Sequence, residues 1–322
     1  MADAGAGEPD WIELHNTTDQ PIDIGGWFLS DNGDELTRYE IAAGTSIAAG
    51  GYLVFFEDLH FSNADDPGCH EPFALSRKGE TVYLHSGTDG VLTGYSEQEK
   101  FDASEAGVSQ GRYLKSTGST NFVSLAEPTP GMANGAAKVG PVVISEIMYN
   151  PPSVADAEYV ELCNISDEVV TLYDGAAGIP WRFTDDPDDP GIELLFPTDP
   201  PVMLAPGECL IVTKDLAIFD AAYIVPEGTQ LFAWGDGKLA NSREKIQLSK
   251  PGDQNEGETT WIRLDRVVYS DGQHPEDFAS GVDPWPIQAD GFGGALTRVD
   301  PATYGNDPAN WQATVPSPGF IN

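Results

Sequence analysis

The sequence predicts an all-β fold divided between two domains. Its 35 glycines and 25 prolines are too many for a helical protein of 322 residues. Apolar and polar residues alternate over short stretches bounded by turn formers, which is the pattern of half-buried strands. A series of short motifs also runs through the chain twice in the same order, with a period far longer than that of solenoid repeats. These observations together predict two β-sandwich domains, each large enough to bury its own core.

The two copies correspond motif by motif. The first copy contains Trp11–Asn16, Ser46–Phe55, Phe73–Ser76, Val82–Leu84 and Pro128–Asn134. The second copy contains Tyr159–Asn164, Met203–Val212, Lys238–Ser242, Ile246–Leu248 and Pro316–Asn322. The short, weakly hydrophobic segment Gly135–Pro141 joins them and is typical of a domain boundary. We therefore expect one domain over residues 1–138 and a second over residues 139–322.

The alternation of apolar and polar residues predicts the first strand of each shared series. Ile12 and Leu14 would face one side of a strand, and Val160 and Leu162 repeat this spacing. Polar turns follow in both copies, and each turn leads into a second apolar stretch, residues 22–24 and 169–172.

The next strands follow tight turns. Ala48–Gly51 and Ala205–Gly207 each turn the chain into an apolar strand, residues 52–56 and 209–213. The second copy is longer because of insertions, which include Asp185–Gly191 and the stretch from Asp271 to Asp290.

One strand is expected in the second copy alone. Val142–Met148 is a strand-like segment before Tyr159, whereas Met1–Gly7 leads straight into Trp11. If Met1 corresponds to Met148, the first copy lacks its first strand. We therefore expect a fragment of a longer protein with any export signal upstream. The exposed sheet edge would invite a strand from a neighbouring chain or from upstream sequence.

The charge of the chain excludes some partners. There are 52 acidic against 16 basic residues, a net charge of -36 shared by both halves. Such a surface repels nucleic-acid phosphates and anionic lipids, so nucleic acid is excluded as a partner. No apolar run approaches the length of a membrane span, which argues against membrane insertion. Dispersed carboxylates are most simply a solvated surface, with specific binding of cations as the alternative.

The motifs resemble those of the lamin tail domain, an immunoglobulin-like β-sandwich of nuclear lamins and many secreted bacterial proteins. Residues 144–148, 159–164, 206–212 and 316–322 of the second copy fit the outline of the bacterial versions. The resemblance extends over nearly the whole chain and implies two tandem immunoglobulin-like sandwiches. It also implies a non-catalytic module of an extracellular or cell-surface protein, and it implies no substrate.

The second copy departs from the family pattern at one place. Asp174–Trp181 replaces the glycine–tryptophan segment that the first copy has at Gly25–Asp31, which puts the local strand pairing in doubt.

The sequence lacks the common catalytic motifs, including the nucleophile elbow, the phosphate-binding loop and the zinc-protease helix. Glu13 and Glu161 occupy matching positions and could suggest acid–base work, but each belongs to its own domain. We interpret both as acceptors of hydrogen bonds from turns. Asn16 and Asn164 are interpreted in the same way, as residues that bond the backbone of the next turn.

Calcium is the most specific ligand hypothesis. Asp185, Asp186, Asp188 and Asp189 crowd one loop, and hard cations bind such carboxylates together with loop carbonyls. Asp31–Glu35 is a second, weaker candidate. Neither loop has the spacing of an EF-hand, and solvated turns are the alternative for both.

The cysteines offer a structural test. Cys163 and Cys209 align with His15 and Tyr52, so the second copy has cysteine at both positions. A disulfide between them would be natural in an exported domain, and two buried thiols are the alternative. Cys69 is then left unpaired.

Two classes of function remain. The leading hypothesis is a structural or adhesive module that binds protein partners or self-assembles. The alternative is a calcium- or carbohydrate-binding accessory domain of a secreted enzyme. Glycan binding would need exposed indoles, and the candidates are Trp27, Trp181, Trp234, Trp261, Trp285 and Trp311.

Overall fold

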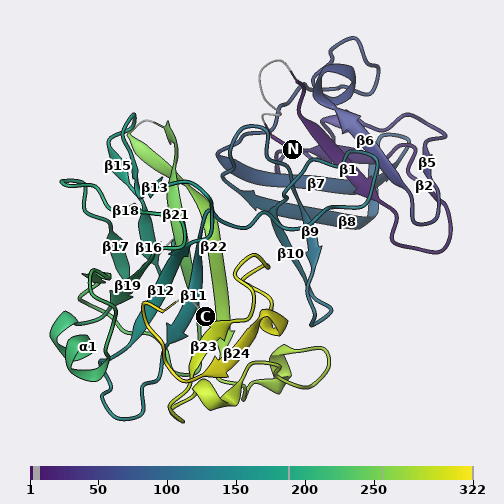
Figure 1. Ribbon diagram of the computed structural model, residues 1–322. Helices are drawn as coiled ribbons and strands as arrows, with labels where there is room; N and C mark the ends of the chain where they lie inside the picture. The colour runs from purple at the N-terminus through teal and green to yellow at the C-terminus, as the bar shows by residue number, and fades with distance from the viewer. Residues whose placement is uncertain (3–7, 188, 256, 321–322) are drawn as a thin grey trace. The chain divides into compact units, whose positions relative to one another are not determined.

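The computed structural model describes residues 1–2, 8–187, 189–255 and 257–320 (Figure 1). It separates into two compact units. Unit 1 contains Met1–Tyr113 and Thr120–Lys138, and unit 2 contains Leu114–Ser119 and Val139–Asn322. Both consist mainly of strands, which confirms the all-β class.

Unit 1 is built from ten strands and one short π-helical turn in its described residues. The strands are β1 (Trp11–His15), β2 (Ile22–Asp23), β3 (Phe28–Ser30), β4 (Tyr39–Glu40), β5 (Ser46–Ile47), β6 (Tyr52–Phe56), β7 (Gly79–Thr88), β8 (Val91–Asp102), β9 (Gln110–Leu114) and β10 (Thr120–Ser124). The π-helical turn, Glu57–Phe61, follows β6 directly.

Four sheets organise unit 1. One has the order β4-β3-β7-β8, and three two-stranded sheets pair β1 with β6, β2 with β5, and β9 with β10. The apolar faces of these sheets meet in one core, because Ile12, Leu29, Ile47 and Phe55 belong to a single buried cluster.

Unit 2 repeats this plan with more strands. They are β11 (Val142–Met148), β12 (Tyr159–Asn164), β13 (Val170–Thr171), β14 (Tyr173–Asp174), β15 (Ile179–Pro180), β16 (Arg182–Thr184), β17 (Glu193–Leu195), β18 (Met203–Leu204), β19 (Cys209–Thr213), β20 (Gln230–Ala233), β21 (Arg243–Asn255), β22 (Glu258–Ser270), β23 (Ala295–Arg298) and β24 (Trp311–Thr314). Its helical segments are α1 (Leu216–Ala222) and the 3-10 turns Pro275–Asp277, Ile287–Ala289 and Pro308–Asn310.

The sheets of unit 2 match those of unit 1 in order. The sheet β17-β16-β21-β22 corresponds to β4-β3-β7-β8, and the pair β13-β18 corresponds to β2-β5. The register agrees as well, since Leu29 pairs with Leu84 where Phe183 pairs with Leu248. The pair β12-β19 likewise has the place of β1-β6.

The largest difference between the two units is one strand, β11, which unit 2 contains and the described residues of unit 1 do not. In unit 2, β11 lies between β12 and β23 in a six-stranded sheet of order β20-β19-β12-β11-β23-β24 (Figure 1). In the described residues of unit 1, β1-β6 and β9-β10 are separate two-stranded sheets with no strand between them.

Unit 2 also carries additions. The segment around α1 follows β19, and Asp215 caps the helix by accepting the backbone N–H groups of Ala217 and Ile218. The strand β20 then adds to β19 in parallel. The segment Asp174–Trp181, whose pairing was in doubt, contributes to a small hairpin in which β14 pairs with β15.

Candidate functional site

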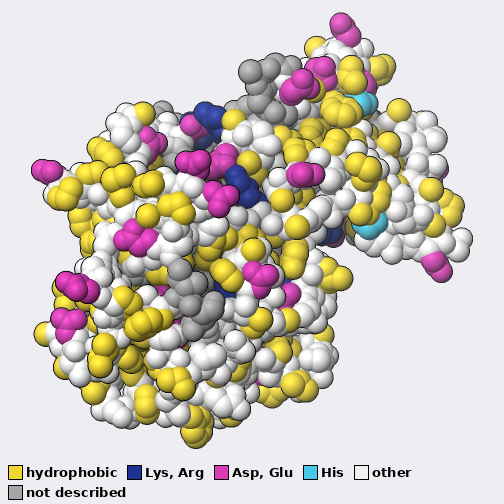
Figure 2. Space-filling view, in the orientation of Figure 1, with side chains coloured by type: hydrophobic (Ala, Val, Ile, Leu, Met, Phe, Trp, Pro, Cys, Tyr) yellow, Lys and Arg dark blue, Asp and Glu magenta, His cyan; other side chains and the backbone are white. Residues whose placement is uncertain are grey.

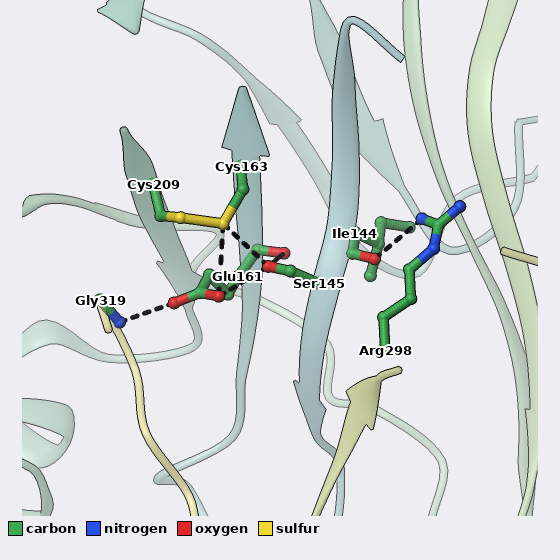
Figure 3. Close-up of a disulfide and its surroundings, with 7 residues drawn as sticks. All are labelled: Ile144, Ser145, Glu161, Cys163, Cys209, Arg298 and Gly319. Carbon is green, nitrogen blue, oxygen red and sulfur yellow. Dashed lines mark hydrogen bonds between the residues drawn. A yellow bond between two sulfur atoms is a disulfide. The ribbon is translucent and has the colours of Figure 1, made fainter. Parts of the chain in front are cut away.

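The structure joins Cys163 and Cys209, the pair that the alignment of the two copies singled out. The cysteines are register partners on β12 and β19, with Sγ atoms 1.97 Å apart and Cα atoms 4.1 Å apart (Figure 3). The same register position in unit 1 holds His15 and Tyr52, whose rings stack with centroids 4.2 Å apart. A covalent link in one unit thus occupies the place of an aromatic stack in the other.

Glu161 lies beside the disulfide and is buried. The Ser145 hydroxyl donates to its Oε1 at 2.6 Å, and the Gly319 backbone N–H donates to its Oε2 at 2.6 Å (Figure 3). Burial raises the pKa of Glu161 to about 7, although both hydrogen bonds act in the opposite direction. Gly319 belongs to the closing motif, so Glu161 ties the end of the chain to β12.

Glu13 makes the equivalent contact in unit 1. Its Oε2 accepts the backbone N–H of Gly131 at 2.5 Å, and Gly131 belongs to the closing motif of the first copy. Burial raises the pKa of Glu13 as well. Each glutamate therefore accepts a hydrogen bond from a turn within its own unit.

The two asparagines also act alike. The Asn16 side chain accepts the N–H of Thr18, and its amide donates to three backbone carbonyls, those of Gln20, Ile47 and Ala48. Asn164 accepts the N–H of Ser166 and donates to the carbonyls of Glu168 and Leu204. Both side chains therefore supply hydrogen bonds to backbone groups of the turn after the first shared strand.

Asp10 and Glu158 form a further matched pair, which the sequence analysis missed. Asp10 accepts the N–H of Leu75 at 3.0 Å, and Glu158 accepts that of Leu239 at 2.8 Å. Both acids directly precede the first shared strand, and both acceptors reach the same motif. Burial raises the pKa of Glu158 to about 7.

Glu80 and Glu244 extend the series. Glu80 accepts the N–H of Ser76 at 2.5 Å, and Glu244 accepts that of Ala240 at 2.8 Å. Burial raises the pKa of Glu80 to about 7 and also raises that of Glu244. The signal in the sequence was an acid at the second residue of each long strand, β7 and β21.

A pocket of about 350 Å³ in unit 2 adjoins the disulfide and is lined in part by Ser145, Glu161 and Arg298. A hydroxyl that donates to a buried carboxylate resembles a nucleophile with its base. However, Glu13 and Glu161 each accept the backbone N–H of a glycine in the closing motif of their own unit. The shared role of the two glutamates is therefore to hold the backbone.

The metal-binding potential of the described residues is confined to one cluster. Ligand atoms of Glu161, Cys163 and Cys209 lie within 4.8 Å of one another. Both sulfurs belong to the disulfide, so neither is the thiolate that a soft metal would require.

The calcium candidates do not converge in the described part of the chain. Asp185 accepts the N–H groups of Asp186 and Gly191, which closes its own loop. Asp186 lies 3.3 Å from Lys245 Nζ. Asp188 lies outside the described residues, and Asp189 joins no cluster of three ligand atoms there. In the second candidate loop, Asp31 pairs with Arg38 at 2.5 Å.

The candidate indoles are mostly core residues. Four of them are at most 7% exposed, namely Trp181, Trp234, Trp285 and Trp311. Trp27 packs against the core of unit 1, and Trp261 lies 4.4 Å from the guanidinium of Arg182. These six side chains therefore present no exposed row of indoles for a sugar to stack on.

Acidic side chains are dispersed over the visible face of the molecule. In Figure 2 they stand singly or in small groups among hydrophobic and neutral side chains. This arrangement is typical of a solvated acidic surface.

The comparisons with known proteins agree with the fold. Residues 1–100 match the model of the Lamin Tail Domain family, an immunoglobulin-like structural domain. No curated protein matches the chain significantly. Among the described residues, no helix has the length and apolar character needed to cross a membrane.

Proposed function

We propose that the chain is a tandem pair of lamin-tail-like modules and serves as a non-catalytic structural or adhesive part of an extracellular or cell-surface bacterial protein. The observation that carries this proposal is the duplicated set of polar contacts. Four matched pairs of side chains bind backbone N–H groups at matched places in both units.

This duplication gives the perturbed carboxylates a structural explanation. A strongly shifted pKa often marks a catalytic acid or base, but structural networks shift pKa values too. Here Glu80 and Glu158 have pKa values of about 7 and each accepts a backbone N–H. A catalytic carboxylate would be needed once at a cleft, whereas a scaffold contact recurs in each copy of the fold.

The disulfide supports an extracellular setting. Structural disulfides persist in oxidising compartments and are rare where thiols are kept reduced. Cys163 and Cys209 are each 7% exposed and link neighbouring strands, which favours a structural over a redox-active bond.

Activity assays on the purified chain test the non-catalytic proposal. We expect no hydrolysis of ester, glycoside or phosphoester substrates above background. The matched variants Glu13→Gln and Glu161→Gln show whether any trace of activity depends on one of these carboxylates. Turnover that one of these variants abolishes, while the chain stays folded, would refute the proposal.

Calcium binding by the Asp185 loop is a separate hypothesis with its own test. The Tm of the chain and of the variant Asp185→Asn is measured in millimolar calcium and in the same concentration of magnesium. A calcium-specific rise in Tm that Asp185→Asn removes supports the site. Equal Tm values in the two ions contradict it.

A further inference from the structure

The pocket beside the disulfide lies where three strands of unit 2 meet the turns around them. Its lining includes Ser145 on β11, Glu161 and Cys163 on β12, and Thr297 on β23. The turns that follow β12 and precede β19 complete much of the wall. A volume of about 350 Å³ is within the range of sites that hold small organic molecules. The pocket is therefore large enough for a small ligand.

The carboxylate of Glu161 lies at the wall of this pocket. Its Oε1 is 2.6 Å from Ser145 Oγ and 3.4 Å from Cys163 Sγ, and both of these side chains line the pocket (Figure 3). The hydroxyl donates to Oε1, whereas the disulfide sulfur has no proton to donate. An ionised carboxylate offers about four acceptor sites. Oε1 therefore keeps the capacity to accept a further hydrogen bond.

Glu161 is also buried without a cation beside it. The described residues contain every lysine, arginine and histidine of the chain, and none of them forms an ion pair with this glutamate. Its side chain belongs to a residue that is 2% exposed, and the charged neighbour that raises its pKa further is another acid, Glu146. Buried charges in proteins are normally paired, because they lose their hydration. The pocket thus offers a negative charge that the described residues do not neutralise.

Arg298 lines the pocket too, but its own charge is already paired. Its side chain is 0% exposed and lies 2.6 Å from Asp265. The guanidinium also donates to the backbone carbonyls of Ile144 and Thr303. Its Nε has no hydrogen-bond partner among the described residues, but this atom is buried. The guanidinium therefore offers little to an anionic ligand.

The rest of the lining combines apolar surface with more negative charge. Ile165, Pro206 and Pro301 contribute apolar atoms, and Asp167 is an exposed acid in the turn after β12. The net charge of the chain, -36, attracts cations in general. A complementary ligand has an apolar body and one positive group that reaches Glu161.

We infer that this pocket binds a small organic primary amine, whose ammonium donates to Glu161 Oε1 and whose apolar body contacts Ile165, Pro206 and Pro301. An ammonium has three donors and no acceptor. The Ser145 hydroxyl can accept a second hydrogen bond from it, because its own proton is donated to Glu161. The site does not compete with the backbone contact of Glu161, since Gly319 donates to Oε2.

Three probes with the same phenethyl group and different charge test the site on the full chain. They are phenethylamine, phenethyl alcohol and 3-phenylpropionate. Isothermal titration calorimetry measures their affinities at about pH 8, where the amine is protonated and Glu161, with a pKa of about 7, is mostly ionised. Backbone amide shifts in NMR spectra locate the binding site, with Ser145, Gly207 and Thr297 as reporters in the lining.

We expect phenethylamine to bind with a Kd of about 1 mM or lower. It should bind about tenfold or more tightly than phenethyl alcohol, because the amine alone forms a charged hydrogen bond with the carboxylate. The 3-phenylpropionate anion should bind more weakly than the alcohol, since Glu161 repels it. The shifted amides should belong to residues that line the pocket.

Glu161→Gln separates loss of charge from loss of structure. The amide keeps an acceptor for the Gly319 N–H, so the affinity for phenethylamine should fall by about tenfold or more, to that for the alcohol. An unchanged affinity for the alcohol shows that the pocket is intact in this variant. Glu227→Gln, an exposed change in unit 2 that removes the same charge, should leave all three affinities unchanged.

The inference is overturned if phenethylamine at about 10 mM does not bind the parent chain, or binds it no more tightly than phenethyl alcohol does. Both results are obtained without any variant, so they hold even if Glu161→Gln does not fold. Tightest binding of 3-phenylpropionate would also overturn it, because the pocket would then select an anion at Arg298. The same holds if the amine shifts amides outside the lining alone.

Discussion

Several glutamates in this chain lose solvation on folding and accept hydrogen bonds from the backbone of loops. Glu161 is 2% exposed, and its carboxylate holds the closing turn through the Gly319 N–H. Burial disfavours the charged form, which is why the pKa values of Glu80, Glu158 and Glu161 rise to about 7. The folded chain thus binds protons more tightly at these sites than the unfolded chain does.

The pH dependence of stability follows from this difference. An unfolded glutamate titrates near 4.5, so between pH 4.5 and 7 the unfolded state loses its protons first. The stabilising effect of protonation is full below pH 4.5 and is lost as pH rises to about 7. Urea unfolding at pH 5 and pH 7.5 should show most of the loss, about 2 kcal/mol for Glu161.

Glu161→Gln isolates the contribution of one residue. The amide keeps a hydrogen-bond acceptor and loses the buried charge, so its stability should fall less between pH 5 and pH 7.5. The exposed Glu227→Gln is the matched control and should follow the parent chain. An unchanged pH dependence in Glu161→Gln would show that this carboxylate is not the titrating group.

Among the strands, the two units have matching sheets but differ in the side-chain interaction at one register position. Unit 2 joins β12 to β19 with a disulfide, and unit 1 stacks His15 on Tyr52 at that place. The link closes a loop with a sequence separation of 46 residues, which restricts the unfolded chain.

Removal of the disulfide should therefore destabilise unit 2 selectively. We expect the double variant Cys163→Ala, Cys209→Ala to lose about 2–4 kcal/mol of unfolding free energy. Hydrogen exchange resolves the two units, and β12 and β19 should lose protection while β1 and β6 keep theirs. Equal loss of protection in both units would contradict an independent role for this bond.

Much of this element structure could be predicted from the sequence, and the exceptions have physical causes. The strands β1, β6, β12 and β19 follow from alternation and turn residues, which are local signals. The contact of Asp10 with Leu75 joins residues 65 positions apart, and no local pattern encodes it. The Asp185 loop shows the reverse problem, because the acids are adjacent in sequence but Asp185 accepts the backbone N–H groups of Asp186 and Gly191 in its own loop.

At the scale of the whole molecule, a net charge of -36 is spread over two compact units. Mutual repulsion of these charges disfavours the folded state, and dissolved salt screens it. We expect Tm to rise as sodium chloride increases from about 10 mM to about 500 mM, since the Debye length falls from about 30 Å to a few ångströms. Potassium chloride should act equally. A Tm that is indifferent to both salts would show that surface repulsion contributes little.

Both units use one polar scaffold, and residue-resolved amide exchange by NMR measures whether its backbone contacts form in each unit. We expect slow exchange at three matched pairs of amides outside the strands: Thr18 and Ser166, Leu75 and Leu239, Gly131 and Gly319. Rapid exchange at the members from one unit, with protection in the other, would contradict the shared scaffold.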